Sequence, residues 1–90
     1  MKAWELLDSP EKWTRGWYAR TEYGDRTGAN CVDATCWCMK GAITHCYPYG
    51  LWDVVIATLM QRLGPHFTAW NDAPSRTWEE VHAVLKELDI

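Results

Sequence analysis

The helical character of this chain is clearest in the segment LWDVVIATLMQRL, which runs from Leu51 to Leu63. Apolar residues occupy most of its positions, and its strongly polar residues lie near its ends. Gly64 and Pro65 follow, and this pair is a common helix stop because glycine accepts a left-handed backbone conformation. A helix that is apolar nearly all round is usually buried. We therefore expect residues 51–63 to form the central helix of a bundle.

A second helix is expected from Trp78 to about Leu88. Thr77 precedes it, and Glu80 follows three residues later, which is the pattern of a capping box at a helix start. Apolar residues recur on one face of this segment, and charged residues lie on the other. The pattern predicts an amphipathic helix that packs against the core.

A third helix is expected to begin after Asp33, as its N-cap, and to run to about Cys46. Pro48 would end it. Gly41 lies in the middle of this helix, where glycine costs about 1 kcal/mol relative to alanine. A compensating reason would be the close approach of another backbone segment across the surface of Gly41 and Ala42.

The N-terminal third is less regular. Residues 2–8 are expected to form one or two helical turns, and Pro10 to begin another short one. Residues 17–21 have the composition of a strand, and turn-forming residues follow. A short β-hairpin returning near Arg26-Thr27 or near Cys31-Val32 is one interpretation, and an irregular loop is the other. The sequence thus predicts a mainly α fold, a small three- to four-helix single domain of residues 1–90.

Composition excludes several classes of function. The chain has 90 residues, 9 basic and 12 acidic, and a formal net charge of −3. Because it has no run of basic residues, we expect neither nucleic-acid binding nor polybasic attachment to a membrane. Acidic residues near the start argue against a signal peptide, and the longest apolar run, residues 54–57, is too short to span a bilayer. A cytoplasmic location is therefore expected, and the oligomeric state is left open.

The segment AWNDAPSRT, from Ala69 to Thr77, is the first candidate binding site. Trp70 could stack on a ligand ring while Asn71, Asp72 and Arg76 bind its polar edge. In the alternative structural interpretation, Asn71 and Asp72 fix the loop, Arg76 pairs with Asp72, and Trp70 fills the core. The structural role is the commoner one for such loops.

The second candidate lies in the N-terminal third. The chain contains seven tryptophans, which is more than a small core is expected to hide, so one or two should be partly exposed. Trp17 stands between Arg15 and Arg20, and interleaved aromatic and arginine residues are enriched at interaction surfaces. Equally, alternate residues of a hairpin could cover the helices while the others face water.

No metal, cofactor or catalytic centre is predicted. Zinc could in principle be bound by the cysteines, which are Cys31, Cys36, Cys38 and Cys46. Their spacing matches no common zinc site, and reduced thiols are expected in the cytoplasm. The three histidines lie on separate predicted elements, so nothing in the sequence pairs a nucleophile with a base.

Two motifs together resemble a known group of proteins. One is W-C-x-x-G-A-I, from Trp37 to Ile43, and the other is A-W-N-D-x-P-x-R-T, from Ala69 to Thr77. The combination is similar to a family of small uncharacterised proteins of actinobacteria, other bacteria and their phages. The resemblance covers about residues 13–88, and it implies no activity.

From these patterns we expect a small cytoplasmic, non-enzymatic binding protein. A phage-encoded protein that acts on a host protein is one form of this expectation. Trp17 or Trp70 would anchor the partner, and Arg15, Arg20 or Arg76 would set the polarity of the interface. The alternative is a protein that binds or sequesters a small, nucleotide-like ligand through the loop from Trp70 to Arg76. An enzyme ranks lowest.

Overall fold

The computed structural model describes residues 1–90 and is mainly helical. Its α-helices are α1 (Ala3–Leu6), α2 (Met39–Cys46), α3 (Trp52–Leu63), α4 (Phe67–Asp72) and α5 (Trp78–Leu88). Two short 3-10 helices are η1 (Pro10–Lys12) and η2 (Tyr49–Leu51), and three two-residue strands are β1 (Ala19–Arg20), β2 (Arg26–Thr27) and β3 (Cys36–Trp37). The predicted mainly α class with a short β-hairpin in the N-terminal third is confirmed.

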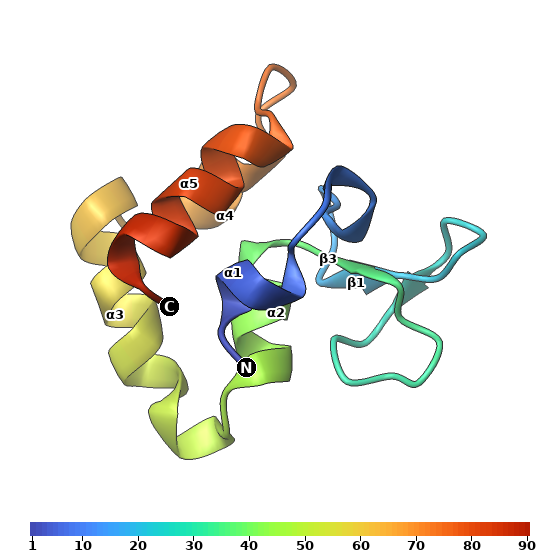
Figure 1. Cartoon of the computed structure of the whole chain (residues 1–90), viewed down its shortest axis with the longest axis horizontal. Helices are drawn as coiled ribbons and strands as arrows, with labels where there is room; N and C mark the ends of the chain where they lie inside the picture. The colour runs from blue at the N-terminus through green and yellow to red at the C-terminus, as the bar shows by residue number, and fades with distance from the viewer.

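The helix at the centre of the molecule is α2. It contacts α1, α3, α4 and β3, and Figure 1 shows it between the C-terminal helices and the strands. Met39, Ala42 and Ile43 are fully buried, because the small residues of α2 let neighbouring elements approach closely. No helix of the protein is long and apolar enough to cross a membrane.

The prediction that residues 51–63 form the central helix is wrong. α3 spans nearly these residues and ends at Gly64, as expected, but the Gly64 backbone (φ 87°, ψ 176°) is not the expected left-handed cap, and only Val55 and Leu59 are buried. It lies at the edge of the molecule opposite the strands (Figure 1). The apolar residues on its outer side therefore remain uncovered.

The strands form one antiparallel sheet in the order β2-β1-β3. The hairpin returns at Arg26-Thr27, which is the first of the two predicted positions. The helix predicted to begin after Asp33 starts at Met39 instead, with Cys38 as its N-cap. Backbone pairing explains the difference, because Thr35 N and Cys38 N donate to the carbonyls of Arg20 and Tyr18 and hold residues 35–38 against β1.

The expected close approach at Gly41 is present. A Cβ atom built on Gly41 would overlap the carbonyl oxygen and carbon of Tyr18. Glycine is therefore required here by packing, despite its low helix propensity. This contact sets the distance between α2 and the lead-in to β1.

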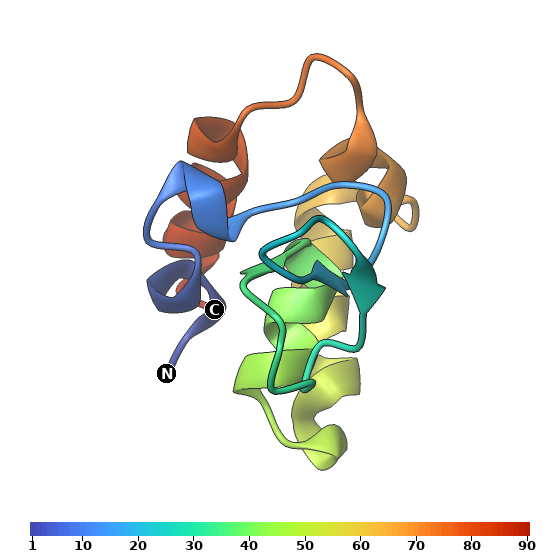
Figure 2. The ribbon, with the colours of Figure 1, turned by 90° about the vertical axis from the view of Figure 1, so that its right-hand side faces the viewer.

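The C-terminal half contains a helix, α4, that the sequence did not predict. Residues 69–72, part of the segment 69–77 that was expected to be a loop, belong to this helix, and the turn at 73–77 is irregular. The predicted capping box is present, since Thr77 Oγ1 accepts from Glu80 N while Glu80 Oε1 accepts from Thr77 N. Beyond α5, Asp89 lies beside Lys2, with Lys2 Nζ 2.7 Å from Asp89 Oδ2, so the two ends of the chain meet (Figure 2).

Candidate functional site

The indole N–H groups separate the seven tryptophans into two sets. Five donate to acceptors within the protein, namely those of Trp4, Trp13, Trp37, Trp52 and Trp78. Trp17 and Trp70 have no such acceptor. Trp70 is half-buried and packs against the hydrophobic core, which fits the structural interpretation of its ring. Trp17 is the one tryptophan that is both exposed and without an internal acceptor.

Trp70 is covered by a neighbouring arginine. The guanidinium carbon of Arg76 lies 3.8 Å from the Trp70 ring centroid, and Arg76 Nε donates to the Trp70 carbonyl at 2.8 Å. Arg76 Nη1 donates to Glu80 Oε2 at 2.9 Å, so the predicted pairing of Arg76 with Asp72 is wrong. The turn before α5 directs Arg76 towards the first turn of that helix, where Glu80 is fixed by the capping box.

Arg15 and Arg20 hold loops in place. Arg15 Nη2 donates to the Arg76 carbonyl, and its guanidinium lies 4.8 Å from the Trp13 ring centroid. Arg20 donates to the carbonyls of Gly24 at 3.1 Å and Arg15 at 3.2 Å. Both guanidinium groups thus donate to carbonyl groups within the protein, and these N–H donors are not available to a binding partner.

Asn71 joins three segments through its amide. Its Oδ1 accepts from Trp13 Nε1 at 2.8 Å and from Met39 N at 3.2 Å. Its Nδ2 donates to the Thr14 carbonyl at 3.3 Å and to Asp72 Oδ1 at 2.8 Å. A primary amide has two donors and two acceptor positions, so Asn71 is fully bonded, and only 1% of it is exposed.

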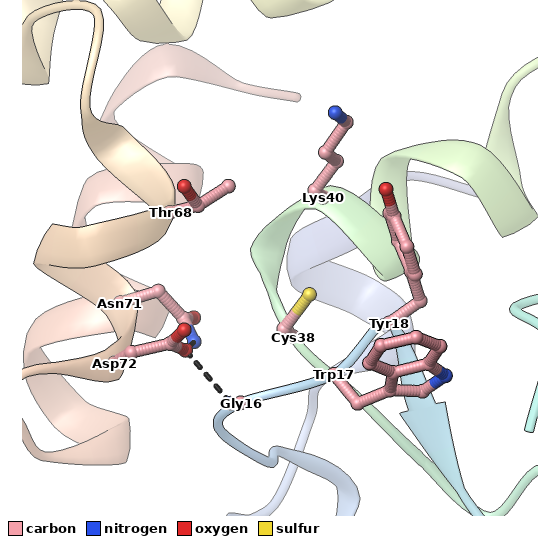
Figure 3. Close-up of a pocket in the computed structure, with 8 residues that line it drawn as sticks. All are labelled: Gly16, Trp17, Tyr18, Cys38, Lys40, Thr68, Asn71 and Asp72. Atoms are coloured by element: carbon pink, nitrogen blue, oxygen red, sulfur yellow. Dashed lines mark hydrogen bonds between the residues drawn. The ribbon is translucent and has the colours of Figure 1, made fainter. Parts of the chain in front are cut away.

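A pocket of about 250 Å³ lies beside Trp17 (Figure 3). We call it the Trp17 pocket, and it is lined by Gly16, Trp17, Tyr18, Cys38, Lys40, Thr68, Asn71 and Asp72. α4 supplies one wall, residues 16–18 supply the opposite wall, and the start of α2 lies between them. The pocket brings together three of the predicted binding residues, Trp17, Asn71 and Asp72, whereas Arg15, Arg20, Trp70 and Arg76 lie outside its lining.

Two polar groups define one end of the Trp17 pocket. Asp72 Oδ1 accepts from Gly16 N at 2.9 Å, which ties the two walls together (Figure 3). Cys38 Sγ accepts from Gly41 N at 3.3 Å. Burial raises the pKa of the Cys38 thiol above its ordinary value, so this sulfur is a neutral wall of the pocket at neutral pH.

Two cations flank the aromatic side of the pocket. The guanidinium of Arg26 lies 4.9 Å from the Trp17 ring centroid, and Lys40 Nζ lies 5.7 Å from that of Tyr18. The two rings meet edge to face, with centroids 5.8 Å apart. Neither cation has a carboxylate partner among the ion pairs of the protein, which are Lys2–Asp89, Lys12–Asp8, Arg62–Glu87 and Arg76–Glu80.

A second hollow of about 560 Å³ shares two lining residues with the first. Its lining residues are Tyr18, Ala29, Lys40, Thr44, Tyr49, Trp52, Asp53 and Ile56, so Tyr18 and Lys40 belong to both hollows. We call the two hollows together the aromatic groove. The sequence did not connect Lys40, Tyr49 and Trp52 with Trp17, because they come from separate elements that only the tertiary fold brings together.

The cysteines and histidines do not come together in one site. Cys31 is exposed, Cys38 is buried, and Cys36 and Cys46 are half-buried, all as free thiols. No group of three or more His, Cys, Asp and Glu side chains is arranged to hold a metal ion. His45 Nδ1 lies 2.9 Å from the Ala29 carbonyl, and the His82 ring stacks on Trp78 at 4.9 Å, so both rings have packing roles.

Comparison with known proteins gives one match. The model of a family of unknown function, DUF6197, matches residues 1–88. The chain belongs to the DUF6197 family. The expectation of an uncharacterised family is confirmed to that extent. No curated protein and no solved structure matches this DUF6197 protein significantly.

Proposed function

We propose that this DUF6197 protein is a small non-enzymatic binding protein whose aromatic groove holds an extended segment of a protein partner. The observation that carries the proposal is Trp17. The residue is 41% exposed, its indole N–H has no acceptor within the protein, and it borders a pocket. Tryptophan at such a position is the commonest type of binding hot spot, because a partner can bury the ring and satisfy its N–H together.

The shape of the groove favours a chain segment over a compact ligand. The two hollows share Tyr18 and Lys40 as lining residues, and Tyr49, 81% exposed, lines the second one. An extended peptide would cover both hollows and leave its carbonyl oxygens near the indole of Trp17 and the ammonium of Lys40. Lys40 and Arg26 carry no internal ion pair, so carbonyl or carboxylate groups of a partner can bind them without breaking one.

The nucleotide-like alternative at residues 70–76 has less support. A ligand ring stacked on Trp70 would have to displace the guanidinium of Arg76, which also donates to Trp70 and Glu80. Asn71 has no free donor or acceptor for a ligand edge. The Cys38 thiol is neutral, and no basic side chain forms a hydrogen bond with its sulfur. An enzymatic role that uses Cys38 as a nucleophile therefore has no support either.

The proposal includes the cellular setting expected from the sequence. The protein would act in the cytoplasm of a bacterium, as a bacterial or phage-encoded accessory protein that contacts a host protein. We also propose that relatives share the two motifs. The family model matches residues 1–88 and so covers both segments, which meet in this chain where Asn71 of A-W-N-D accepts from Met39 N of W-C-x-x-G-A-I.

The test is affinity capture from bacterial lysate with three immobilised proteins. Wild type and Tyr23→Ala are expected to retain the same partner, and Trp17→Ala is expected to lose it. Tyr23 is the matched control, because it is an exposed aromatic residue, 82% exposed, outside the groove. Equal capture by a folded Trp17→Ala variant would contradict the proposal.

Native mass spectrometry of the purified protein addresses the alternative. A discrete bound molecule with the absorbance of a nucleobase would favour the small-ligand function. If Trp17→Ala keeps that molecule while Arg76→Ala releases it, the ligand lies at residues 70–76 and outside the groove.

A further inference from the structure

The aromatic groove carries free hydrogen-bond donors on three of its aromatic side chains. The indole N–H of Trp17 has no acceptor within the protein, and the hydroxyls of Tyr18 and Tyr49, at 41% and 81% exposed residues, form no internal hydrogen bond. Tyr47, outside the groove, is different, because its hydroxyl donates to the Ile90 carbonyl at 2.8 Å. A partner in the groove therefore meets donors that the fold leaves unused.

Few free acceptors accompany these donors. Asp72 Oδ1 already accepts from Gly16 N at 2.9 Å and from Asn71 Nδ2 at 2.8 Å. Asp53 lies in the first turn of α3, where the helix dipole favours a carboxylate. The groove thus suits a ligand that accepts hydrogen bonds and donates few.

A run of prolines has this chemistry. Proline has a carbonyl acceptor and no backbone N–H, so such a run presents acceptors alone. It adopts the polyproline II conformation without internal hydrogen bonds, which leaves its carbonyl groups free for the donors of the groove. An added β-strand would instead bring N–H groups for which the groove has few acceptors.

The aromatic rings provide surfaces on which proline rings can pack. Trp17 and Tyr18 meet edge to face with centroids 5.8 Å apart, and Tyr49 and Trp52 do so at 4.9 Å. Trp52 Nε1 donates to the Tyr47 carbonyl at 2.7 Å, which fixes the Trp52 ring. Grooves lined by aromatic residues are the usual binding sites of polyproline II segments.

Two cations beside these rings add a preference for acidic residues. The Arg26 guanidinium lies 4.9 Å from the Trp17 ring centroid, and Lys40 Nζ lies 5.7 Å from that of Tyr18. Neither belongs to an ion pair of the protein. Carboxylates of a bound segment would complement both charges.

We propose that the aromatic groove binds a proline-rich segment in the polyproline II conformation, flanked by acidic residues. Trp17, Tyr18 and Tyr49 donate to carbonyl groups of the segment, and Lys40 and Arg26 bind its carboxylates. This inference rests on the proposed function and adds the chemistry of the partner.

The experiment is an NMR titration of the nitrogen-15-labelled protein with the peptide acetyl-EPPPPPPE-amide. The indole N–H signal of Trp17, identified by its loss in Trp17→Ala, is expected to shift and to saturate as the peptide concentration rises to about 1 mM, as for a weak complex. The peptide acetyl-ESASASAE-amide has the same length and charge but more backbone N–H groups, and it should cause no saturable shift. The peptide acetyl-KPPPPPPK-amide should bind more weakly, because its charges oppose those of Lys40 and Arg26.

Conservative variants test the donors themselves, with binding measured by calorimetric titration. Tyr18→Phe and Tyr49→Phe keep the rings and remove only the hydroxyls, so each should weaken binding of acetyl-EPPPPPPE-amide about 2- to 10-fold, the effect of one lost hydrogen bond. Tyr23→Phe is the matched control, because Tyr23 is exposed outside the groove, and it should bind as wild type does.

The inference is overturned if acetyl-EPPPPPPE-amide gives no saturable shift, if acetyl-ESASASAE-amide or acetyl-KPPPPPPK-amide binds equally well, or if both phenylalanine variants bind as wild type does. Capture of a lysate partner that depends on Trp17, without binding of the proline peptide, would overturn this inference and leave the proposed function in place. Absence of both would overturn the two together.

Discussion

Asn71 shows how one polar side chain holds distant parts of this small protein together. It lies on α4, yet its amide bonds reach Trp13, Thr14 and Met39. Those partners come from the N-terminal lead-in and from the start of the central helix. The residue was expected to fix its own loop or bind a ligand, and the structure gives it a longer-range bonding role.

Replacing Asn71 with alanine is expected to destabilise the protein by about 2–5 kcal/mol. The substitution leaves the indole N–H of Trp13 and the amide N–H of Met39 without an acceptor, and each is costly to bury unpaired. Urea denaturation followed by circular dichroism measures the change. Thr68→Ala, an exposed change on the same helix, should stay within about 0.5 kcal/mol of wild type, and equal effects of the two would contradict the role of Asn71.

At the scale of elements, the contact between α2 and the lead-in to β1 depends on the absence of a side chain at Gly41. In an ordinary helix interior, glycine to alanine stabilises by about 1 kcal/mol. Here Gly41→Ala is expected to destabilise by about 1–3 kcal/mol, because its Cβ would collide with the backbone of Tyr18. The measurement is the free energy of unfolding from urea titration.

Gly50→Ala is the control for that substitution. A Cβ at Gly50 meets no atom within 4 Å, and its φ is not positive. This variant should be as stable as wild type or slightly more stable. An equally stable Gly41→Ala variant would contradict the close contact between the backbones of Gly41 and Tyr18.

The elements also show what a sequence can reveal. The helix from Trp78 to Leu88 was predicted with its capping box, because capping is a local interaction between Thr77 and Glu80. The close approach at Gly41 was predicted because an unfavourable residue needs a compensating contact. Local chemistry was sufficient in both cases.

Where tertiary contacts compete with local preference, the sequence was misleading. Asp33 is a good N-cap residue, but pairing with β1 holds the following residues in a strand and delays the helix to Met39. The hydrophobicity of residues 51–63 does not reveal that α3 lies at the edge. The candidate site was found in part, since Trp17 and Asp72 line the pocket, whereas the contributions of Lys40 and Trp52 depend on packing between elements.

At the scale of the whole molecule, stability should depend on pH through groups at the two ends of α5. The backbone N–H of Thr77, followed in importance by its hydroxyl and by Arg76, lowers the pKa of Glu80, and hydrogen bonds from Lys2 and Trp4 lower that of Asp89. A lowered folded-state pKa contributes stability above the unfolded value. That contribution disappears as the pH falls through the folded value.

The whole protein is therefore expected to lose stability as the pH falls below about 4.5, the ordinary value for glutamate. Glu80→Gln should be less stable than wild type at pH 7, and the difference should shrink towards acid, because protonated Glu80 resembles glutamine. Urea midpoints measured at neutral and acid pH test this.

High salt separates the ion pair from the capping box. At about 1 M salt the Debye length is only about 3 Å, which weakens the exposed ion pair between Glu80 and Arg76 but not the capping hydrogen bond. The acid-dependent difference should therefore survive in high salt, and its disappearance would show that the ion pair, not the capping box, stabilises the Glu80 carboxylate.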